Sequence, residues 1–207
     1  MRLLGRSSSI NVRKVLWTCA ELSLSVERED WGTGFRSTQA PEFLALNPNG
    51  LVPVLIDGDV VLWESHAICR YLARREGRTD LLPSTPREAA RVEQWMDWQA
   101  TELNSAWRYV FMARVRRDPS FDDARAAEAS AARWNTLMTL LDRQLQATGA
   151  HVAGDGFSLA DIVLALSAHR WRSTPMDARP ALPAVETWLQ RLQSRPGFQA
   201  TCSAEHP

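Results

Sequence analysis

The chain has 207 residues, of which 45% are hydrophobic, and its 24 basic and 24 acidic side chains give a formal net charge of +0. This length suits one large or two modest domains, and the balanced charge gives no electrostatic reason to expect nucleic acid or a membrane surface as a partner. No apolar run approaches the roughly 18 residues of a membrane span, and the first residues lack the apolar core of a signal peptide. The cysteines, Cys19, Cys69 and Cys202, lack metal-ligand spacing. We therefore expect a cytoplasmic protein without a metal site.

The first part of the chain alternates between strand-like and helix-like patterns. Asp57-Gly58 is a strong turn pair and joins two of the strands as a hairpin. Val12, Val15 and Cys19 recur at helical spacing and mark the first helix. The resulting β-α-β-α-β-β-α order fits a small thioredoxin-like sheet, which we place in residues 1–77. The predicted strands are 2–4, 25–30, 52–56 and 60–63, and the predicted helices are 11–22, 41–46 and 65–76.

A linker with two prolines separates this part from the rest of the chain. Residues 78–86 contain Pro83 and Pro86, which interrupt any helix. Beyond them no strand pattern occurs, so we predict that residues 87–207 form an all-helical domain. The predicted helices are 87–116, 121–148, 158–171 and 183–194.

Residues 47–65 carry the most informative motif. Asn47-Pro48-Asn49-Gly50-Leu51-Val52-Pro53-Val54-Leu55 leads through the hairpin turn to Trp63-Glu64-Ser65, where a helix opens. Backbone groups before Pro53 can pair with a peptide, Glu64 supplies a negative charge, and the helix N-terminus at Ser65 attracts a carboxylate. A ligand with a peptide bond, an ammonium and a carboxylate fits all three features, and glutathione is such a molecule.

The pattern Asn-Pro-x-Gly-x-Val-Pro-x-Leu followed by Glu-Ser-x-Ala-Ile resembles the thioredoxin-fold half of the cytosolic glutathione S-transferases. The similarity runs through essentially the whole chain and includes residues 7–9, 41–44 and 157–161. It implies a bacterial, serine-type protein similar to the theta, zeta and delta classes. The implied fold is an α/β thioredoxin-like N-terminal domain plus an all-α C-terminal domain, and the implied assembly is a homodimer.

The resemblance implies roles for the residues of the motif. In this fold the proline before the third strand is expected to be cis, so that Val52 turns its backbone groups toward the peptide of glutathione. An ordinary trans proline at a strand start is the alternative reading of Pro53. Ser65 is implied to bind the γ-glutamyl carboxylate, and Glu64 to face the γ-glutamyl end. A serine here is also a standard N-cap, which stabilises a helix by about 1 kcal/mol without any ligand.

The thiol of glutathione must ionise before it attacks an electrophile, and an ordinary thiol has a pKa of about 8.5. A hydroxyl that donates to the sulfur near the N-terminus of the first helix would stabilise the thiolate. Ser7, Ser8 and Ser9 lie where serine-type members keep this group, and Ser9 is nearest to the helix. Asn11 is a rival, because its side-chain amide can also donate to sulfur. The plain alternative is that these serines only solvate and cap a loop.

Other subclasses of the family fit the chain less well. Ile10 occupies the region where some classes place a cysteine, and no tyrosine is nearby. Cys19 lies on the apolar stripe of the first helix, so we expect it to pack in the core. The approximate counterparts of the basic residues that hold the glycine end of glutathione are Thr38 and Gly50, and neither is charged. Arg36, Asn49 or the partner subunit would supply that contact; His66 could also reach the ligand.

The helical domain should supply the wall for the second substrate. Trp107, Val110, Phe111 and Arg114 lie along one side of its first helix, and we name Trp107 and Phe111 as candidates. Aromatic residues at helical spacing are nevertheless core more often than pocket. We expect Trp95, Trp98 and Gln99 to pack internally or at a dimer contact.

Residues 157–161 resemble a capping box with a hydrophobic staple. Ser158 would cap the helix, Asp161 would reach back to it, and Phe157 would pack against the helix. We interpret this segment as structural rather than catalytic.

The resemblance thus predicts an enzyme of detoxification that uses glutathione as a co-substrate, together with a small, hydrophobic electrophile. Its reaction would be conjugation or the glutathione-dependent removal of halide, and the fold does not choose between these. A serine-type enzyme could also reduce peroxides. The rival hypothesis is a non-catalytic protein that retains the fold as a carrier of apolar ligands or as a partner-binding module.

Overall fold

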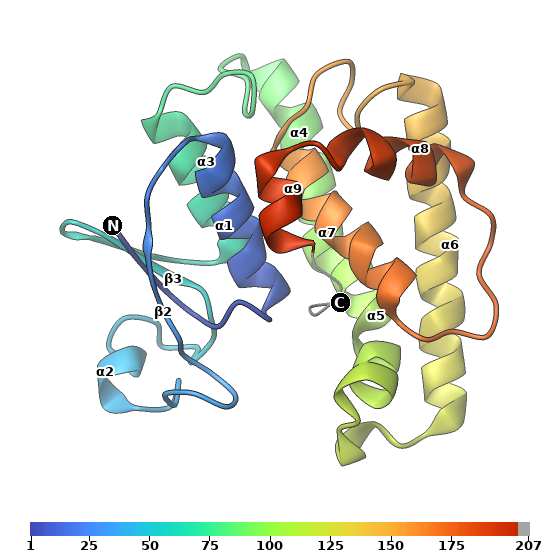
Figure 1. The fold of residues 1–207 in the computed structure, drawn as a ribbon, viewed down its shortest axis with the longest axis horizontal. Coiled ribbons are helices and arrows are strands. Elements are labelled where there is room, and N and C mark those ends of the chain that lie inside the picture. Colours follow the sequence, from blue (N-terminus) through green and yellow to red (C-terminus); the bar gives the residue numbers. More distant parts are fainter. Residues whose placement is uncertain (203–207) are drawn as a thin grey trace.

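The structure is a computed structural model that describes residues 1–202. It confirms the predicted fold class, since a thioredoxin-like α/β part and an all-helical part lie side by side (Figure 1). The sheet has the strand order β2-β1-β3-β4, with β1 parallel to β2 and antiparallel to β3. The strands are β1 (Arg2–Leu4), β2 (Glu27–Glu29), β3 (Val54–Asp57) and β4 (Val60–Trp63).

The predicted hairpin around Asp57-Gly58 is confirmed. β3 and β4 pair antiparallel with Asp57 opposite Val60, and Gly58 has a φ of 62°, a left-handed conformation that suits glycine. Three helices belong to this part of the chain, and their bounds agree with the predicted ones to within two residues. They are α1 (Ile10–Glu21), α2 (Pro41–Leu44) and α3 (Ser65–Arg75).

The helical part begins with one long helical run that alternates between α-helical and π-helical winding. The predicted helix 87–116 is present, but it contains two π-helical segments. Its pieces are α4 (Pro86–Trp98), η1 (Gln99–Leu103), α5 (Asn104–Phe111) and η2 (Met112–Arg116). The further elements are η3 (Pro119–Phe121), α6 (Ala124–Thr148), α7 (Leu159–Ser173), α8 (Pro183–Leu192) and α9 (Pro196–Thr201).

α1 connects the two parts of the molecule. It packs against α3 on one side and against α7 and α9 on the other (Figure 1). The short helix α9 was not predicted, and its contact with α1 is close: a Cβ added to Gly197 would lie 2.1 Å from the Cδ1 of Trp17. Eight of the twelve residues of α1 are buried, and these include the polar side chains of Arg13, Lys14 and Thr18.

α7 is the centre of the helical part. It is apolar around most of its circumference, as expected of a helix surrounded by others, and most of its residues are buried. The predicted capping box at its start is present: the backbone N–H of Ser158 donates to Asp161 Oδ2 at 2.9 Å. Cys19 is buried in the core as predicted. Within residues 1–202 no helix is long and apolar enough to cross a membrane.

Candidate functional site

A pocket of about 280 Å³ lies where α1, the start of α3 and the run from α4 to α5 meet. Three of the predicted site residues, Asn11, Glu64 and Ser65, come together in its wall, although they are far apart in the sequence. Asn11 and Lys14 share one face of α1 because they are three residues apart. The wall consists of Asn11, Lys14, Glu64, Ser65, His66, Ala67, Arg70, Asp97, Ala100 and Asn104.

Glu64 and Ser65 present the N-terminus of α3 to this pocket. Ser65 is the first residue of the helix and Glu64 occupies the N-cap position, so the prediction of Ser65 as the cap is wrong by one residue. Glu64 has a φ of 70°, a conformation that costs a non-glycine residue on the order of 1–3 kcal/mol and is often found at functional sites. Ser65 is buried, and its hydroxyl has no hydrogen-bond partner within the described residues. The hydroxyl is therefore available to a ligand.

The loop before β3 presents Val52. The Val52–Pro53 bond is cis, as predicted. In the part of the chain that the structure describes, neither the N–H nor the carbonyl of Val52 has a hydrogen-bond partner. Asn47 holds this loop: its Nδ2 donates to the carbonyl of Leu51 at 2.7 Å, and its Oδ1 accepts from the backbone and side chain of Asn49 at 3.0 Å each.

The N-terminus of α1 carries the candidates for thiol activation. Ser9 is the N-cap residue, and its half-buried hydroxyl makes no hydrogen bond to the helix. Asn11 is also half-buried and lines the pocket, whereas Ser9 lies outside the pocket wall. The carbonyl of Ser8 accepts a hydrogen bond from Nη2 of Arg116 at 3.3 Å, which ties this loop to the helical part.

Comparisons with known proteins identify the family. The family profiles for "Glutathione S-transferase, N-terminal domain" and "Glutathione S-transferase, C-terminal domain" match residues 1–74 and 100–196. Glutathione S-transferase GstB of Escherichia coli is 40% identical over 199 residues, which are 95% of each chain. The chain belongs to the cytosolic glutathione S-transferase superfamily.

A solved structure of the superfamily agrees with this fold over nearly the whole chain. It is the theta class glutathione S-transferase from Xanthomonas axonopodis pv. citri with glutathione bound, with a TM-score of 0.91, 35% identity and coverage of 97% of this chain and 96% of that one. A relative with another name is the probable elongation factor 1-gamma 2 of Arabidopsis thaliana. It is 32% identical over 171 residues, which are 79% of this chain and 39% of that protein.

The candidates for the glycine end of glutathione already have partners in this transferase. The guanidinium of Arg36 lies 3.9 Å from the ring centroid of Trp31 and within 3.8 Å of two carboxylates, those of Glu29 and Glu42. Asn49 is engaged in the loop described above. Gly50 has a φ of 61° and lies so close to Gln39 that an added Cβ would meet Gln39 Nε2 at 2.4 Å. The side-chain amide of Gln39 is thus an uncharged donor beside this loop.

Trp107 and Phe111 lie deep in the helical part. Trp107 is 8% exposed and Phe111 is 3% exposed, and their ring centroids are 5.4 Å apart. The guanidinium of Arg170 lies over both rings, at 4.5 Å and 4.2 Å from their centroids. Neither ring lines the pocket of Asn11 and Ser65. Their role as the wall of a second-substrate site stays a prediction.

Lys14 is a buried cation of the pocket wall that the sequence analysis missed. It is 2% exposed, and its Nζ lies 2.6 Å from Gln99 Oε1 and 3.0 Å from Nε2 of His66. Burial lowers the pKa of Lys14 to about 7. The sequence contained a signal, because Asn11, Lys14 and Thr18 form a polar stripe at helical spacing on a helix with many apolar residues.

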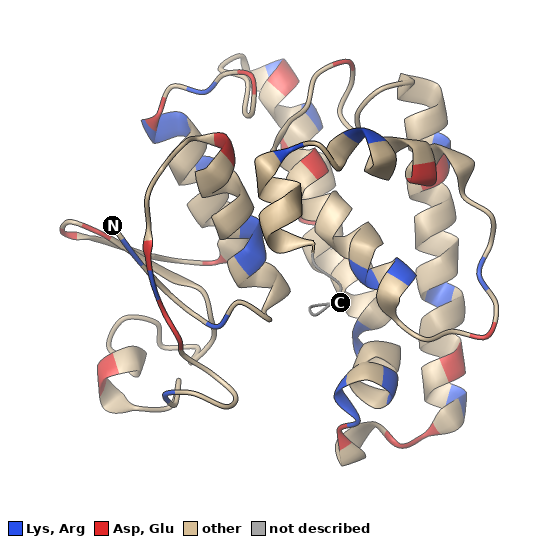
Figure 2. Ribbon diagram, viewed as in Figure 1, with Lys and Arg blue, Asp and Glu red and all other residues tan. Residues whose placement is uncertain are grey.

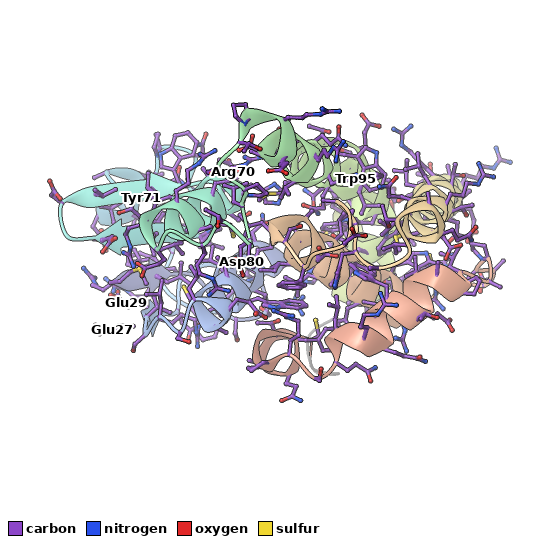
Figure 3. The ribbon with its side chains drawn as sticks, turned by 90° about the horizontal axis from the view of Figure 1, so that it is seen from above. Glu27, Glu29, Arg70, Tyr71, Asp80 and Trp95 are labelled. Carbon is purple, nitrogen blue, oxygen red and sulfur yellow. The ribbon has the colours of Figure 1, made fainter. Side chains whose placement is uncertain are left out.

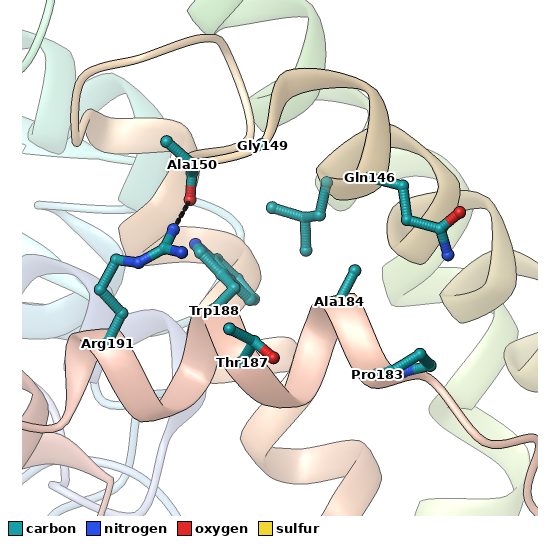
Figure 4. A pocket seen from close by; sticks show the side chains of 9 residues that line it. Gln146, Gly149, Ala150, Pro183, Ala184, Thr187, Trp188 and Arg191 are labelled. Carbon is teal, nitrogen blue, oxygen red and sulfur yellow. Dashed lines mark hydrogen bonds between the residues drawn. The ribbon is translucent and has the colours of Figure 1, made fainter.

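A second cavity, of about 370 Å³, lies between the end of α6 and α8 (Figure 4). Its wall contains one charged side chain, Arg191, whose Nη1 donates to the carbonyl of Ala150 at 2.5 Å (Figure 4). None of the predicted site residues lines it. We therefore take the pocket of Asn11, Glu64 and Ser65 as the functional site.

Proposed function

We propose that the protein is a glutathione transferase that binds glutathione in this pocket and ionises its thiol for attack on an electrophilic carbon. The observation that carries the proposal is the convergence of Glu64, Ser65 and Asn11 from two helices on one pocket. Each group matches one part of the tripeptide. The family membership and the glutathione-bound Xanthomonas relative support the same ligand.

The γ-glutamyl end of glutathione would lie at the start of α3. Its carboxylate would accept hydrogen bonds from the Ser65 hydroxyl and the first N–H groups of the helix, where the helix dipole favours an anion. Its ammonium would face the Glu64 carboxylate. The cysteinyl peptide would pair with the N–H and carbonyl of Val52, both of which lack an internal partner among the described residues.

The thiol would then lie near the start of α1. The hydroxyl of Ser9 makes no bond to the helix, so it can donate to the sulfur, and the N–H groups of the first turn add a positive potential. These interactions favour the thiolate and lower the thiol pKa. Asn11 is the alternative donor, since it already lines the pocket.

The second substrate in this proposal is a hydrophobic electrophile near Trp107 and Phe111. The thiolate would displace halide or another leaving group, in conjugation or dehalogenation. We propose that this chemistry serves detoxification in the cytoplasm. Because the thiolate supplies the electron pair, the step needs no metal. The segment of α5 that bears both rings continues into η2, which contacts the Ser8 loop through Arg116.

We further propose a homodimer that uses the face formed by α3 and α4. Arg70 of α3 and Trp95 of α4, labelled in Figure 3, come from these two neighbouring helices. Trp95 and Trp98 are half-buried and stack edge to face, with ring centroids 5.2 Å apart. Ion pairs of Arg70 with Glu93 and Asp97 link the two helices. Arginine and aromatic side chains are both enriched at interfaces.

The test is the ultraviolet band of the glutathione thiolate, titrated with pH in the wild type, Ser9→Ala and Asn11→Ala. We expect a band that titrates at least one pH unit below the free thiol in the wild type and is lost in Ser9→Ala. Loss in Asn11→Ala alone would transfer the role to Asn11. Ser7→Ala removes a hydroxyl from the same loop away from the helix start and should keep the band; loss of the band in this variant alone would transfer the role to Ser7. A wild type that binds no glutathione would overturn the proposal.

A second candidate function is a non-catalytic partner-binding module. The similarity to an elongation factor subunit, at 32% identity over 79% of this chain, favours it. Glutathione binding without a shifted thiol pKa in the test above would support this candidate over the transferase.

A further inference from the structure

Lys14 is a buried ammonium without a carboxylate partner. Within residues 1–202 no Asp or Glu oxygen lies within the 4.0 Å of an ion pair from its Nζ. Its two hydrogen-bond partners, Gln99 and His66, are neutral acceptors. Burial of an unpaired charge is costly unless a counter-charge is bound, and this cost is why burial lowers the pKa of Lys14 to about 7.

The neighbours of Lys14 hold its amine in one place. Nε2 of Gln99 donates to Oγ of Ser167 at 2.9 Å, and this hydroxyl donates to the carbonyl of Val163 at 3.1 Å. The chain of hydrogen bonds therefore fixes Gln99 with its oxygen toward Lys14. An ammonium has three N–H groups, and two have partners among the described residues, so one remains for a ligand.

The geometry places this amine beneath the start of α3. Lys14 and Ser65 line the same pocket, and His66, which contacts Lys14, is the next residue after Ser65. Figure 2 shows the basic residues of α1 as a blue band in the part of the molecule where α1 meets the helical part. An anion bound at the helix start would thus meet the Ser65 hydroxyl, the helix dipole and the Lys14 charge together.

We propose that Lys14 is the cationic anchor for the α-carboxylate of the γ-glutamyl residue, and that the binding of this carboxylate is accompanied by the uptake of one proton by the Lys14 amine. The inference rests on the proposed function, since it takes glutathione as the ligand. The proton comes from solvent, and no bond other than the new N–H forms or breaks. The alternative is a purely structural role, in which the hydrogen bonds of Lys14 to His66 and Gln99 join α1 to α3 and η1.

The thiol and the imidazole next to Lys14 stay neutral in the range of the test. Burial raises the pKa of the Cys69 thiol to about 11, and burial lowers the pKa of His66 well below its usual range. Burial also lowers the pKa of the Arg170 guanidinium, whose charge would in turn lower the pKa of Lys14. The charged and titratable groups that face Lys14 from the packed elements are Glu64, His66, Cys69 and Arg70 at α3, Asp97 on α4 and Arg170 on α7.

The first experiment measures proton uptake by calorimetry with S-methylglutathione, which has no thiol to ionise. Binding to the wild type at pH 8 is followed in two buffers that differ in their enthalpy of ionisation. We expect the uptake of nearly one proton, and an affinity that is roughly fivefold weaker at pH 8 than at pH 7, because fewer molecules carry the charged amine at the higher pH. Lys14→Met should show neither effect. Binding by the wild type without proton uptake would overturn the proposal.

The second experiment compares S-methylglutathione with its analogue that lacks the γ-glutamyl α-carboxylate. The wild type should bind the analogue at least tenfold more weakly, whereas Lys14→Met should bind the two ligands with similar affinity. An equal loss for both ligands in Lys14→Met would indicate the structural role and overturn the anchor. A wild type that binds neither ligand would instead overturn the proposed function. Arg91→Met, at an exposed position of α4, is the matched control for the removal of a positive charge.

Discussion

The molecule buries two charged side chains in different ways, Asp161 in the helical part and Lys14 beside the pocket. The two oxygens of Asp161 accept hydrogen bonds from four donors at 2.9–3.1 Å, and the side chain is 0% exposed. Lys14 is almost as buried, yet it has two neutral acceptors and one unused N–H. The protein itself supplies hydrogen-bond donors to both carboxylate oxygens of Asp161, whereas one N–H of Lys14 is left for a ligand.

The surroundings of the two groups agree with this difference. Asp161 joins the first turn of α7 to the Val152 backbone and to Nε1 of Trp188 on α8, all inside the helical part. Lys14 lies in the wall of a pocket between the two parts of the molecule. A buried charge with a full set of hydrogen-bond partners stabilises the fold, whereas a buried charge that lacks a partner does not. We therefore assign a structural role to Asp161 and a functional role to Lys14.

The largest effect on stability should come from Asp161→Ala. The change leaves the N–H groups of Ser158, Val152 and Trp188 buried without an acceptor, and we expect a loss of roughly 3–5 kcal/mol in the free energy of unfolding. Denaturant unfolding followed by tryptophan fluorescence measures this loss. The dissociation constant for glutathione, measured on the remaining folded protein, should change less than twofold.

Asp155→Ala serves as the control, because Asp155 is exposed and lies in the same loop. Its effect should stay within about 0.5 kcal/mol. If Asp161→Ala were as stable as this control, the hydrogen bonds of Asp161 would not have the structural role that the comparison assigns to them.

The next largest effect is the pH dependence of stability caused by Lys14. Its pKa is about 7 in the folded protein and near ~10.4 in the unfolded chain, so the unfolded state binds more protons between these values. The contribution of Lys14 to the free energy of unfolding therefore rises with pH in this window, by roughly 2 kcal/mol from pH 7 to pH 9. The measured quantity is the difference in unfolding free energy between the wild type and Lys14→Met at each pH, without glutathione.

This difference cancels the contribution of groups that both proteins share. Burial raises the pKa of Cys19 and Cys202 to about 12, and these thiols would oppose the trend only above the usual thiol pKa. A difference that stays constant from pH 7 to pH 9 would show that the buried amine has an ordinary pKa, and the contrast with Asp161 would then lose its basis.

The sequence predicted those features that depend on local chemistry. The Asp57-Gly58 hairpin needs only a residue that tolerates positive φ, and the box of Ser158 and Asp161 needs only two side chains three residues apart. Residues 52–65 could be predicted as a candidate site because they form one short segment of the chain. The prediction of Glu64 and Ser65 therefore required no knowledge of the rest of the fold.

The missed features depend on contacts between distant segments. The π-helical winding at η1 places Gln99 against Lys14, which is 85 residues away in the sequence, and no local pattern contains that contact. α9 has six residues and owes its position to the close approach of Gly197 to Trp17. The polar stripe with Lys14 was present on α1, but its meaning required the burial of that face by α3 and η1.

The smallest predicted effect, and the one that links stability to function, comes from Glu64→Gly. Glu64 has a φ of 70°, which glycine adopts without strain, so the substitution should raise the free energy of unfolding by about 1 kcal/mol in the absence of ligand. The same change removes the carboxylate that we propose to face the ammonium of glutathione, and affinity should fall at least tenfold. Thermal unfolding with and without glutathione measures both quantities. A variant that is less stable without ligand would show that the backbone at Glu64 is not strained, whereas a more stable variant with weak binding would show that this strain is retained for the sake of the carboxylate at the pocket.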